Sequence, residues 1–257
     1  MTRAIFFDID GTLISFTTHQ ISPALLDALH RLREKGIKLF LATGRHKSMI
    51  KEVLDLFPFD GCITLNGQYC FCNDQVLRSV PLHPEDVKHI VNLTSSNVFP
   101  CIFLSEEDSY INENSPKANV FPQQLSIPLP RVDDPRRALT DGLYQVVAFL
   151  TSDQQHLLTD RAQQLNPMRW HPEFIDVISS GGGKDKGMDA ILDHFHILPE
   201  QTMAFGDGEN DLPMLIHAGI GVAMGSASET VKSQADYVTG TAEEDGILTA
   251  LHHFGIL

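Results

Sequence analysis

Strand-like and helix-like segments alternate at both ends of this 257-residue chain, and this alternation constrains the fold most strongly. Strand-like segments at residues 4–9, 37–42 and 61–65 are separated by helical patterns that begin at Ser22 and at Lys47. Because parallel strands need a crossover helix, this order predicts a βαβαβ unit with a parallel sheet. The alternation resumes with a helix at 186–195 and continues to residue 254. We therefore predict an α/β fold with a doubly wound, Rossmann-like parallel sheet.

The middle of the chain departs from this pattern. Residues 69–72 and 76–80 flank Asn73-Asp74 and predict a hairpin. Strands are predicted at 100–104, 144–150 and 174–178 and helices at 84–95 and 153–165, with several prolines marking loops between them. We therefore expect an inserted α+β domain at residues 82–179, with an antiparallel sheet and helices on one face. Residues 1–81 and 180–257 would form the core domain.

Composition excludes some classes of protein. The apolar fraction of 42% and charged fraction of 20% are those of an ordinary globular protein, and the net charge of -14 disfavours nucleic-acid and membrane partners. Four unevenly spaced cysteines predict buried thiols, since no disulfide framework or complete zinc set is present. No signal-like segment and no long apolar run is found. We expect a cytoplasmic monomer or small homo-oligomer.

Two acids follow the first strand. Asp8 and Asp10 come directly after the apolar run 4–7, and Gly11 lets the chain turn behind them. Two carboxylates this close repel each other, and a divalent cation or a raised pKa on one of them is the usual compensation. The alternative interpretation is a polar strand exit with an Asp-Gly turn.

The second strand ends in a group that suits an anion. Thr43, Gly44 and Arg45 supply a hydroxyl, a flexible backbone and a guanidinium at the carboxyl edge of the sheet. A Thr-Gly turn is also a common structural feature. The Thr43-Gly44 turn is informative because, like Asp8 and Asp10, it places polar residues at the end of a predicted strand.

A second acidic group follows the predicted strand 202–205. Asp207, Glu209 and Asp211 accompany Asn210 there, and oxygen ligands at this spacing fit a hard cation. Stabilisation of the helix macrodipole would explain Glu209 and Asp211, but it would not explain Asp207.

A helix start near residue 184 carries two lysines. Lys184 and Lys186 oppose the macrodipole at this position, so an anionic partner would explain a lysine here. A solvated lysine is the alternative.

Together these segments resemble the four motifs of the haloacid dehalogenase superfamily. The matching segments are DIDGT at 8–12, ATGR at 42–45, Lys186-Gly187 and GDGEND at 206–211. The Thr-Gly-Arg form, the Asn66-Gly67 pair and the long insert resemble, more narrowly, the Cof-type sugar phosphatases, which carry a large α/β cap.

The resemblance implies a role for each matching residue. Asp8 would be the nucleophile that forms an aspartyl phosphate, and Asp10 would be the general acid and then the general base. Mg²⁺ would bind Asp8, the backbone carbonyl of Asp10, and Asp207. The phosphate would be held by Thr43, Gly44, Lys186 and Asn210, with Asp211 orienting the lysine or supporting the metal. The Lys-Gly pairing favours Lys186 over Lys184.

Substrate selection is expected to fall to the cap. Arg169, Trp170, His171 and Glu173 combine stacking and hydrogen-bonding groups, as a sugar site would, although an ordinary strand with a packed Trp has the same pattern. The alternatives on the core side are Asn66, Arg45 and His46.

We therefore expect a Mg²⁺-dependent phosphatase that acts on small phosphorylated metabolites, and among these on sugar (hexose) phosphates. A phosphomutase of similar fold is one alternative, and a phospholigand-binding module without turnover is another. The intact acid pair argues against the binding module. A scaffold role is disfavoured because buried repelling acids cost stability.

Overall fold

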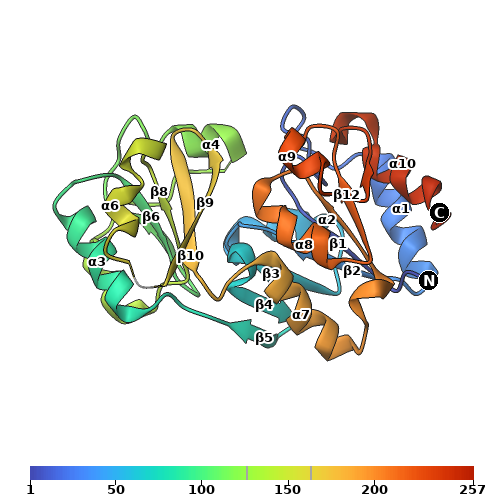
Figure 1. Cartoon of the computed structure of the whole chain (residues 1–257), viewed down its shortest axis with the longest axis horizontal. Helices are drawn as coiled ribbons and strands as arrows, with labels where there is room; N and C mark the ends of the chain where they lie inside the picture. Colours follow the sequence, from blue (N-terminus) through green and yellow to red (C-terminus); the bar gives the residue numbers. More distant parts are fainter. Residues whose placement is uncertain (126, 163) are drawn as a thin grey trace.

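The computed structural model describes residues 1–125, 127–162 and 164–257, and their strands form two separate sheets (Figure 1). The larger sheet has eight strands in the order β13-β12-β11-β1-β2-β3-β4-β5, and the smaller has five in the order β7-β6-β8-β10-β9. Both chain termini lie on the lobe that contains the larger sheet (Figure 1).

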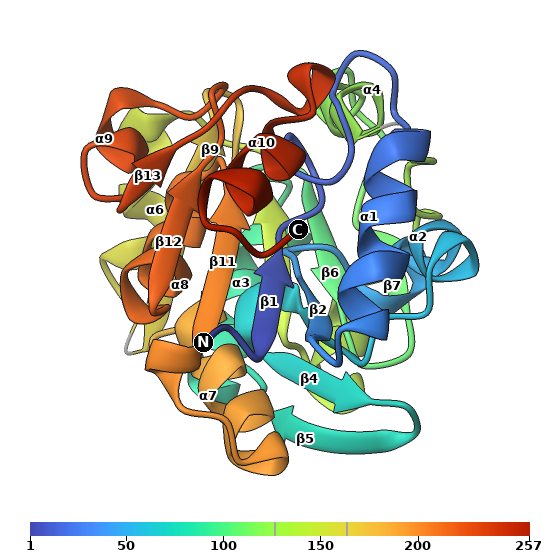
Figure 2. The same ribbon diagram turned by 90° about the vertical axis from the view of Figure 1, so that its right-hand side faces the viewer.

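The larger sheet is mostly parallel and confirms the predicted α/β fold. Its centre is β1 (Ala4–Phe7), which pairs in parallel with β2 (Lys38–Ala42) and β11 (Thr202–Gly206) (Figure 2). Further parallel pairs add β3 (Gly61–Thr64), β12 (Ile220–Ala223) and β13 (Tyr237–Val238). The predicted hairpin, β4 (Tyr69–Cys72) and β5 (Gln75–Ser79), extends one edge antiparallel.

Helices cover both faces of this sheet because the strands are apolar on both sides. Ile5 and Phe7 face a core made with α1 (Pro23–Glu34), α2 (Lys51–Leu56) and α10 (Gly246–His253). Ala4 and Phe6 face the opposite core, which is completed by α7 (Lys184–Phe195), α8 (Leu212–His217) and α9 (Glu229–Lys232). Continuous apolar strands of this kind are typical of a parallel sheet buried on both faces.

The smaller sheet is antiparallel throughout and lies within the range predicted for the insert. Its strands are β6 (Cys101–Leu104), β7 (Ser109–Ile111), β8 (Gln145–Ala148), β9 (Leu165–His171) and β10 (Phe174–Ser179). One face packs against α3 (Pro84–Ser95), α5 (Ala138–Asp141) and α6 (His156–Thr159). The helix predicted at 153–165 is thus much shorter. The bounds 82 and 179 stay a prediction, and we refer to this lobe as the cap.

The other face of the cap sheet looks toward the core domain. Its apolar side chains pack with Phe121 and Leu125 of α4 (Val120–Leu125) and with Leu65 and Tyr69 of the core domain. Polar contacts brace the two connecting segments: Gln68 Nε2 donates to Val80 O at 2.7 Å, and the Arg78 guanidinium donates to Gly67 O and Gly181 O. Hydrogen bonds therefore hold both of the segments that connect the cap to the core domain.

All four cysteines are buried free thiols, and burial raises the pKa of Cys62 and of Cys70 to about 12. Within the described ranges, we find no helix with the length and apolar character needed to cross a bilayer.

Gly67 offers a test of how tightly the core loop meets the second connecting segment. Its φ is 86°, and a Cβ there would lie 1.9 Å from Gly183 O, whereas Gly36, with a φ of 79°, has nothing within 4 Å of such a Cβ. We expect Gly36→Ala to cost about 1 kcal/mol from left-handed backbone alone and Gly67→Ala to cost clearly more. Urea unfolding measures both, and equal losses would contradict the close contact.

Candidate active site

The carboxyl ends of β1, β2 and β11 open into one cavity of about 300 Å³ between the core domain and the cap. Strand ends are where an open α/β sheet places its ligands. The core side of the lining includes all three expected strand-end groups, and the cap adds a mostly apolar wall. The lining includes Asp8, Asp10, Thr43, Gly44, Arg45, His46, Asp207 and Asn210 from the core, and Leu104, Phe121, Leu125, Gln145, Val147 and Asp176 from the cap.

Lys184 joins two of the acids behind this cavity. Its fully buried Nζ donates to Asp8 Oδ1 at 2.7 Å and to Asp211 Oδ1 at 2.5 Å. Burial opposes the ammonium charge, but the carboxylates of Asp211 and Asp8 outweigh it and raise the pKa of Lys184. The site therefore contains a fixed positive charge at the end of β1.

The structure corrects the expected lysine. Lys186 was favoured by the Lys-Gly pairing in the sequence. Its side chain is 54% exposed, and its ion pairs are with Asp185 at 3.3 Å and Asp189 at 3.9 Å. It reaches none of the acids at the strand ends in these contacts. The lysine at the site is Lys184.

Helix geometry explains this correction. The helix α7 begins at Lys184, two residues earlier than predicted, and residues two apart on a helix point to nearly opposite sides. Lys184 shares the buried face with Gly187, Met188 and Ile191. That spacing of three, four and seven residues was present in the sequence and would have identified the inward-facing lysine. Gly187 serves packing instead, because a Cβ there would lie 2.5 Å from Ile63.

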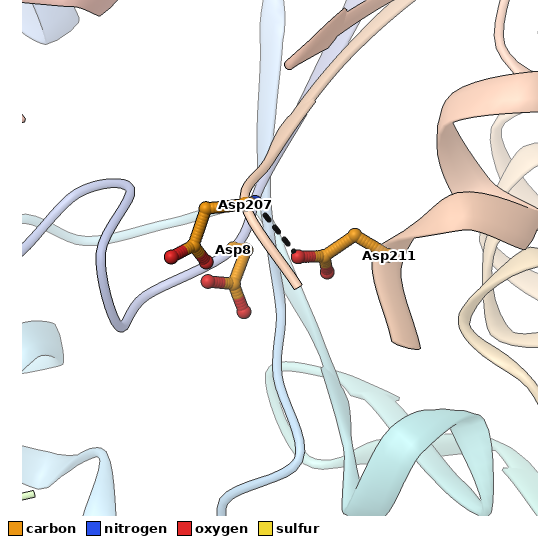
Figure 3. A group of neighbouring side chains, drawn as sticks. All are labelled: Asp8, Asp207 and Asp211. Atoms are coloured by element: carbon orange, nitrogen blue, oxygen red, sulfur yellow. Dashed lines mark hydrogen bonds between the residues drawn. The ribbon is translucent and has the colours of Figure 1, made fainter. Parts of the chain in front are cut away.

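Three carboxylates gather at this point (Figure 3). Oxygen atoms of Asp8, Asp207 and Asp211 all lie within 4.8 Å of one another. Burial, and then the charge of Asp211, raise the pKa of Asp8 to about 7 despite Lys184. Burial and the charge of Asp8 hold the pKa of Asp207 well above its usual range. One lysine therefore does not compensate the negative charge.

The donor set fits a hard divalent cation. Asp211 is already engaged, since its Oδ1 accepts from Lys184 and its Oδ2 accepts from the backbone N–H groups of Asp207 and Gly208 at 3.0 and 2.9 Å. Asp8 and Asp207 remain as the carboxylates that could hold such an ion, which prefers oxygen ligands. Gly11 makes room for them, because a Cβ there would lie 2.1 Å from Asp207 Oδ2.

Asp10 has a different partner from Asp8, namely Arg45. The guanidinium of Arg45 donates from Nε and Nη2 to the two oxygens of Asp10, at 2.8 and 2.6 Å. Arg45 also donates to Leu125 O of the cap at 3.3 Å. Burial opposes the charge of Arg45, but Asp10 outweighs it and raises the pKa of the guanidinium. Arg45, predicted as a substrate contact, lines the cavity with its charge already paired.

Asn66 connects the core domain to the cap. It is fully buried, with a left-handed φ of 52°, and its Nδ2 donates to Gln145 Oε1 at 3.1 Å and to Asp176 Oδ2 at 2.9 Å. Its Oδ1 accepts from Asn210 at 3.0 Å, and Gln145 donates in turn to Gly44 O. Asn66 is outside the cavity lining, so the structure places this predicted substrate residue in a supporting position.

Three members of the predicted cap cluster, Arg169, His171 and Glu173, are also outside the cavity lining. His171 stacks on Phe174 with ring centroids 4.5 Å apart, and Arg169 donates to four backbone carbonyls, which favours the structural interpretation of this strand. The side chain of Trp170 lies outside the part of the chain that the structure describes. His46, the remaining alternative, does line the cavity.

Sequence reasoning missed Gln145 and Asp176, which line the cavity from the cap. Both interrupt otherwise apolar strands that were correctly predicted, and a polar residue inside a buried strand was the available signal.

The chain is similar to one family of hydrolases and to several phosphatases. Residues 5–251 match the family model of haloacid dehalogenase-like hydrolases. The solved structure of the HAD subclass IIB sugar phosphatase BT4131 is similar at a TM-score of 0.92 and 40% identity, covering all of both chains. That of BT1666 from Bacteroides thetaiotaomicron, described among phosphatases of the superfamily, gives 0.91 and 36%, covering 100% of this chain and 96% of that one. The HMP-PP phosphatase of Yersinia pseudotuberculosis is 28% identical over 266 residues, or 99% of this chain and 96% of that protein.

The two lysines provide a matched pair of variants. Lys184→Met leaves the buried carboxylates of Asp8 and Asp211 without their cation, and we expect it to lower the free energy of unfolding by about 3–5 kcal/mol. Lys186→Met removes only exposed ion pairs and should change it by less than about 0.5 kcal/mol. Urea unfolding in EDTA measures both, and similar losses would contradict the assignment of Lys184.

The raised pKa of Asp8 predicts a pH dependence of stability. An acid whose pKa is higher in the folded state takes up a proton on folding, so its stabilising contribution is present at low pH and is lost as the pH rises through the folded value. In metal-free buffer, the stability of the wild type relative to Asp8→Asn should fall between about pH 4 and pH 7. Urea unfolding across this range tests it, and a constant difference would show that Asp8 is ionised throughout.

Proposed function

Because this chain belongs to the family of haloacid dehalogenase-like hydrolases and is a phosphatase, we propose that it hydrolyses small sugar phosphates with Mg²⁺ through an aspartyl phosphate. The observation that carries the proposal is the buried contact of Lys184 with Asp8, beside Asp207. Phosphoryl transfer depends mainly on positioning and charge neutralisation, and this site concentrates both.

Asp8 is the proposed nucleophile. One oxygen of its carboxylate attacks phosphorus, the bond from phosphorus to the ester oxygen breaks, and the leaving group departs as an alkoxide. Attack requires the ionised carboxylate, and Lys184 lies 2.7 Å from Oδ1 to stabilise that form. Mg²⁺, when bound by Asp8, Asp207 and the carbonyl of Asp10, would supply further positive charge for the carboxylate and the phosphate oxygens.

Asp10 is the proposed proton carrier. It would protonate the leaving alkoxide and then take a proton from the water that hydrolyses the aspartyl phosphate. The bidentate contact with Arg45 suits an ionised carboxylate, which is the form needed for the second step. Proton donation in the first step therefore requires this ion pair to open.

The remaining groups of the cavity would hold the phosphate oxygens. Thr43 and Gly44 lie at the end of β2, and Asn210 lines the cavity from the turn after β11. Lys184 takes the place of Lys186 in the proposal, but it acts from behind the cavity lining, through its contact with Asp8. The sugar substrate is supported by the similarity to BT4131, whose name describes a sugar phosphatase. We retain a cytoplasmic location and a monomer or small homo-oligomer as predictions.

A phosphate-release assay tests the proposal. We expect Mg²⁺-dependent release from sugar monophosphates, inhibited by EDTA, and a loss of more than about 1,000-fold in kcat for Asp8→Asn, because the nucleophile is removed. Asp160→Asn, an exposed position in the cap, should retain wild-type activity. Turnover retained by Asp8→Asn would overturn the mechanism, and product analysis would detect a phosphomutase by its isomerised sugar phosphates.

Magnesium should also stabilise the folded protein, since it would bind the repelling carboxylates of Asp8 and Asp207. At 100 times the dissociation constant the expected gain is about 2.7 kcal/mol, which thermal unfolding detects as a rise in Tm. Asp207→Asn should reduce this rise, whereas Asp160→Asn should not. A Tm independent of Mg²⁺ would contradict the proposed metal site.

A further inference from the structure

We propose that Phe16 stacks on the leaving group, so that the enzyme prefers phosphate esters whose leaving group is a ring over open-chain polyol phosphates of the same size. The inference rests on the proposed function, because it concerns the part of the substrate that extends from the phosphate into the cavity. It identifies a specificity-determining residue on the core domain and a substrate class narrower than sugar phosphates in general.

Phe16 contributes an aromatic ring to the cavity but has no part in the proposed mechanism. It lies in the loop between β1 and α1, and it lines the cavity with a relative exposure of 36%. Among the described residues, other exposed large apolar side chains such as Leu198 and Ile216 lie outside this lining. Single exposed apolar side chains are common on protein surfaces, so the distinguishing property of Phe16 is its place at the proposed active site.

The ring lies beside the proposed reaction centre. A Cβ at Gly11 would lie 2.6 Å from Cε2 of Phe16 and 2.1 Å from Oδ2 of Asp207. The edge of the ring and the Asp207 carboxylate therefore both rest against Gly11. A leaving group attached to a phosphate at Asp8 would begin close to this ring.

Hydrogen bonds hold the loop that carries Phe16. The hydroxyl oxygen of Ser15, which is buried, accepts from the backbone N–H groups of Thr17 and Thr18 at 2.9 and 3.1 Å. The same hydroxyl donates to the carboxylate of Glu243. A side chain on a loop that is already held loses less conformational entropy when a ligand packs on it, so more of the contact appears as binding free energy.

The cap bounds the cavity with one face of its sheet, which we call the cap wall. Gln145 of β8 pairs with Leu104 of β6, and Val147 of β8 pairs with Asp176 of β10. All four line the cavity, and residues two apart on a strand share a face. Because Leu104 and Val147 are apolar, a leaving group between this wall and Phe16 would meet hydrocarbon surface from both domains.

A hydroxylated ring suits these surroundings better than an open chain does. The C–H groups of a pyranose form an apolar face that packs on an aromatic ring, while its hydroxyls extend from the edge. Glu209 and Ser228 also line the cavity and offer polar partners for such hydroxyls. An open-chain polyol has no fixed flat face and loses more conformational freedom on binding. The contact with Phe16 therefore favours the ring.

A matched substrate pair tests the inference. Glucose 6-phosphate and sorbitol 6-phosphate have the same number of carbons, the same phosphate position and the same charge, but only the first contains a ring. We expect the wild type to favour glucose 6-phosphate by about three- to tenfold in kcat/KM. Phe16→Ala and Phe16→Leu should lose most of this preference, and Phe16→Tyr should keep it. Leu198→Ala, at an exposed position outside the cavity lining, should leave it unchanged.

Inorganic phosphate separates selection from damage to the reaction centre, since it binds without a leaving group. Phe16→Ala should leave its inhibition constant unchanged. A preference that is lost together with a raised inhibition constant would show that the variant displaces the turn at Gly11, and it overturns the inference. An unchanged ratio of kcat/KM in Phe16→Ala overturns it, and so does a full preference retained by Phe16→Leu, which keeps apolar bulk without a flat ring.

The wild type alone distinguishes failure of the inference from failure of the proposed function. Release of phosphate from p-nitrophenyl phosphate with Mg²⁺, without a preference for glucose 6-phosphate over sorbitol 6-phosphate, overturns the inference and leaves the proposed phosphatase mechanism standing. No release from any of the three compounds overturns the proposed function and the inference with it.

Discussion

The buried contact of Lys184 with Asp8 and Asp211 is the interaction on which the site depends. It joins the end of β1, the first turn of α7 and the turn after β11, three segments far apart in the sequence. A buried carboxylate is costly without a cation or hydrogen bonds, so these segments support one another. Asp211 then uses its other oxygen to hold the backbone of Asp207 and Gly208. Through Asp211, Lys184 thereby also positions the loop that carries Asp207.

Two cations, Lys184 and Arg45, give the neighbouring acids different environments. Asp8 is paired with Lys184 and faces Asp207, whereas Asp10 is paired with Arg45 on the side of the cap. Acids two positions apart on an unbroken strand would lie in one environment and share one compensating positive charge. Here β1 ends at Phe7, and the turn at Gly11 allows the two side chains to diverge. In the proposed mechanism, this divergence lets Asp8 act on phosphorus while Asp10 moves protons.

Features of the fold and site that depend on residues close together in the sequence could be predicted, whereas features that depend on contacts between distant segments could not. The parallel sheet followed from apolar strands such as β1 and β2, because burial on both faces leaves an uninterrupted apolar run. The acids Asp8 and Asp207 were found because they directly follow such strands. The lysine was misassigned because a short sequence pair was given more weight than the helical period that sets Lys184 inward and Lys186 outward. Gln145 and Asp176 were missed because their importance depends on contacts across the cavity, which local patterns do not encode.

Asn66 connects the core side of the site to the cap. One amide accepts from Asn210 beside the phosphate position and donates to Gln145 and Asp176 of the cap wall. A shift of the cap would break these bonds inside a region that excludes water, where unsatisfied polar groups are costly. The position of the cap wall is therefore tied to the same residue that supports the core loop. In the proposed function, contacts of the leaving group with the cap wall and placement of the phosphate by Asn210 would therefore depend on the same residue, Asn66.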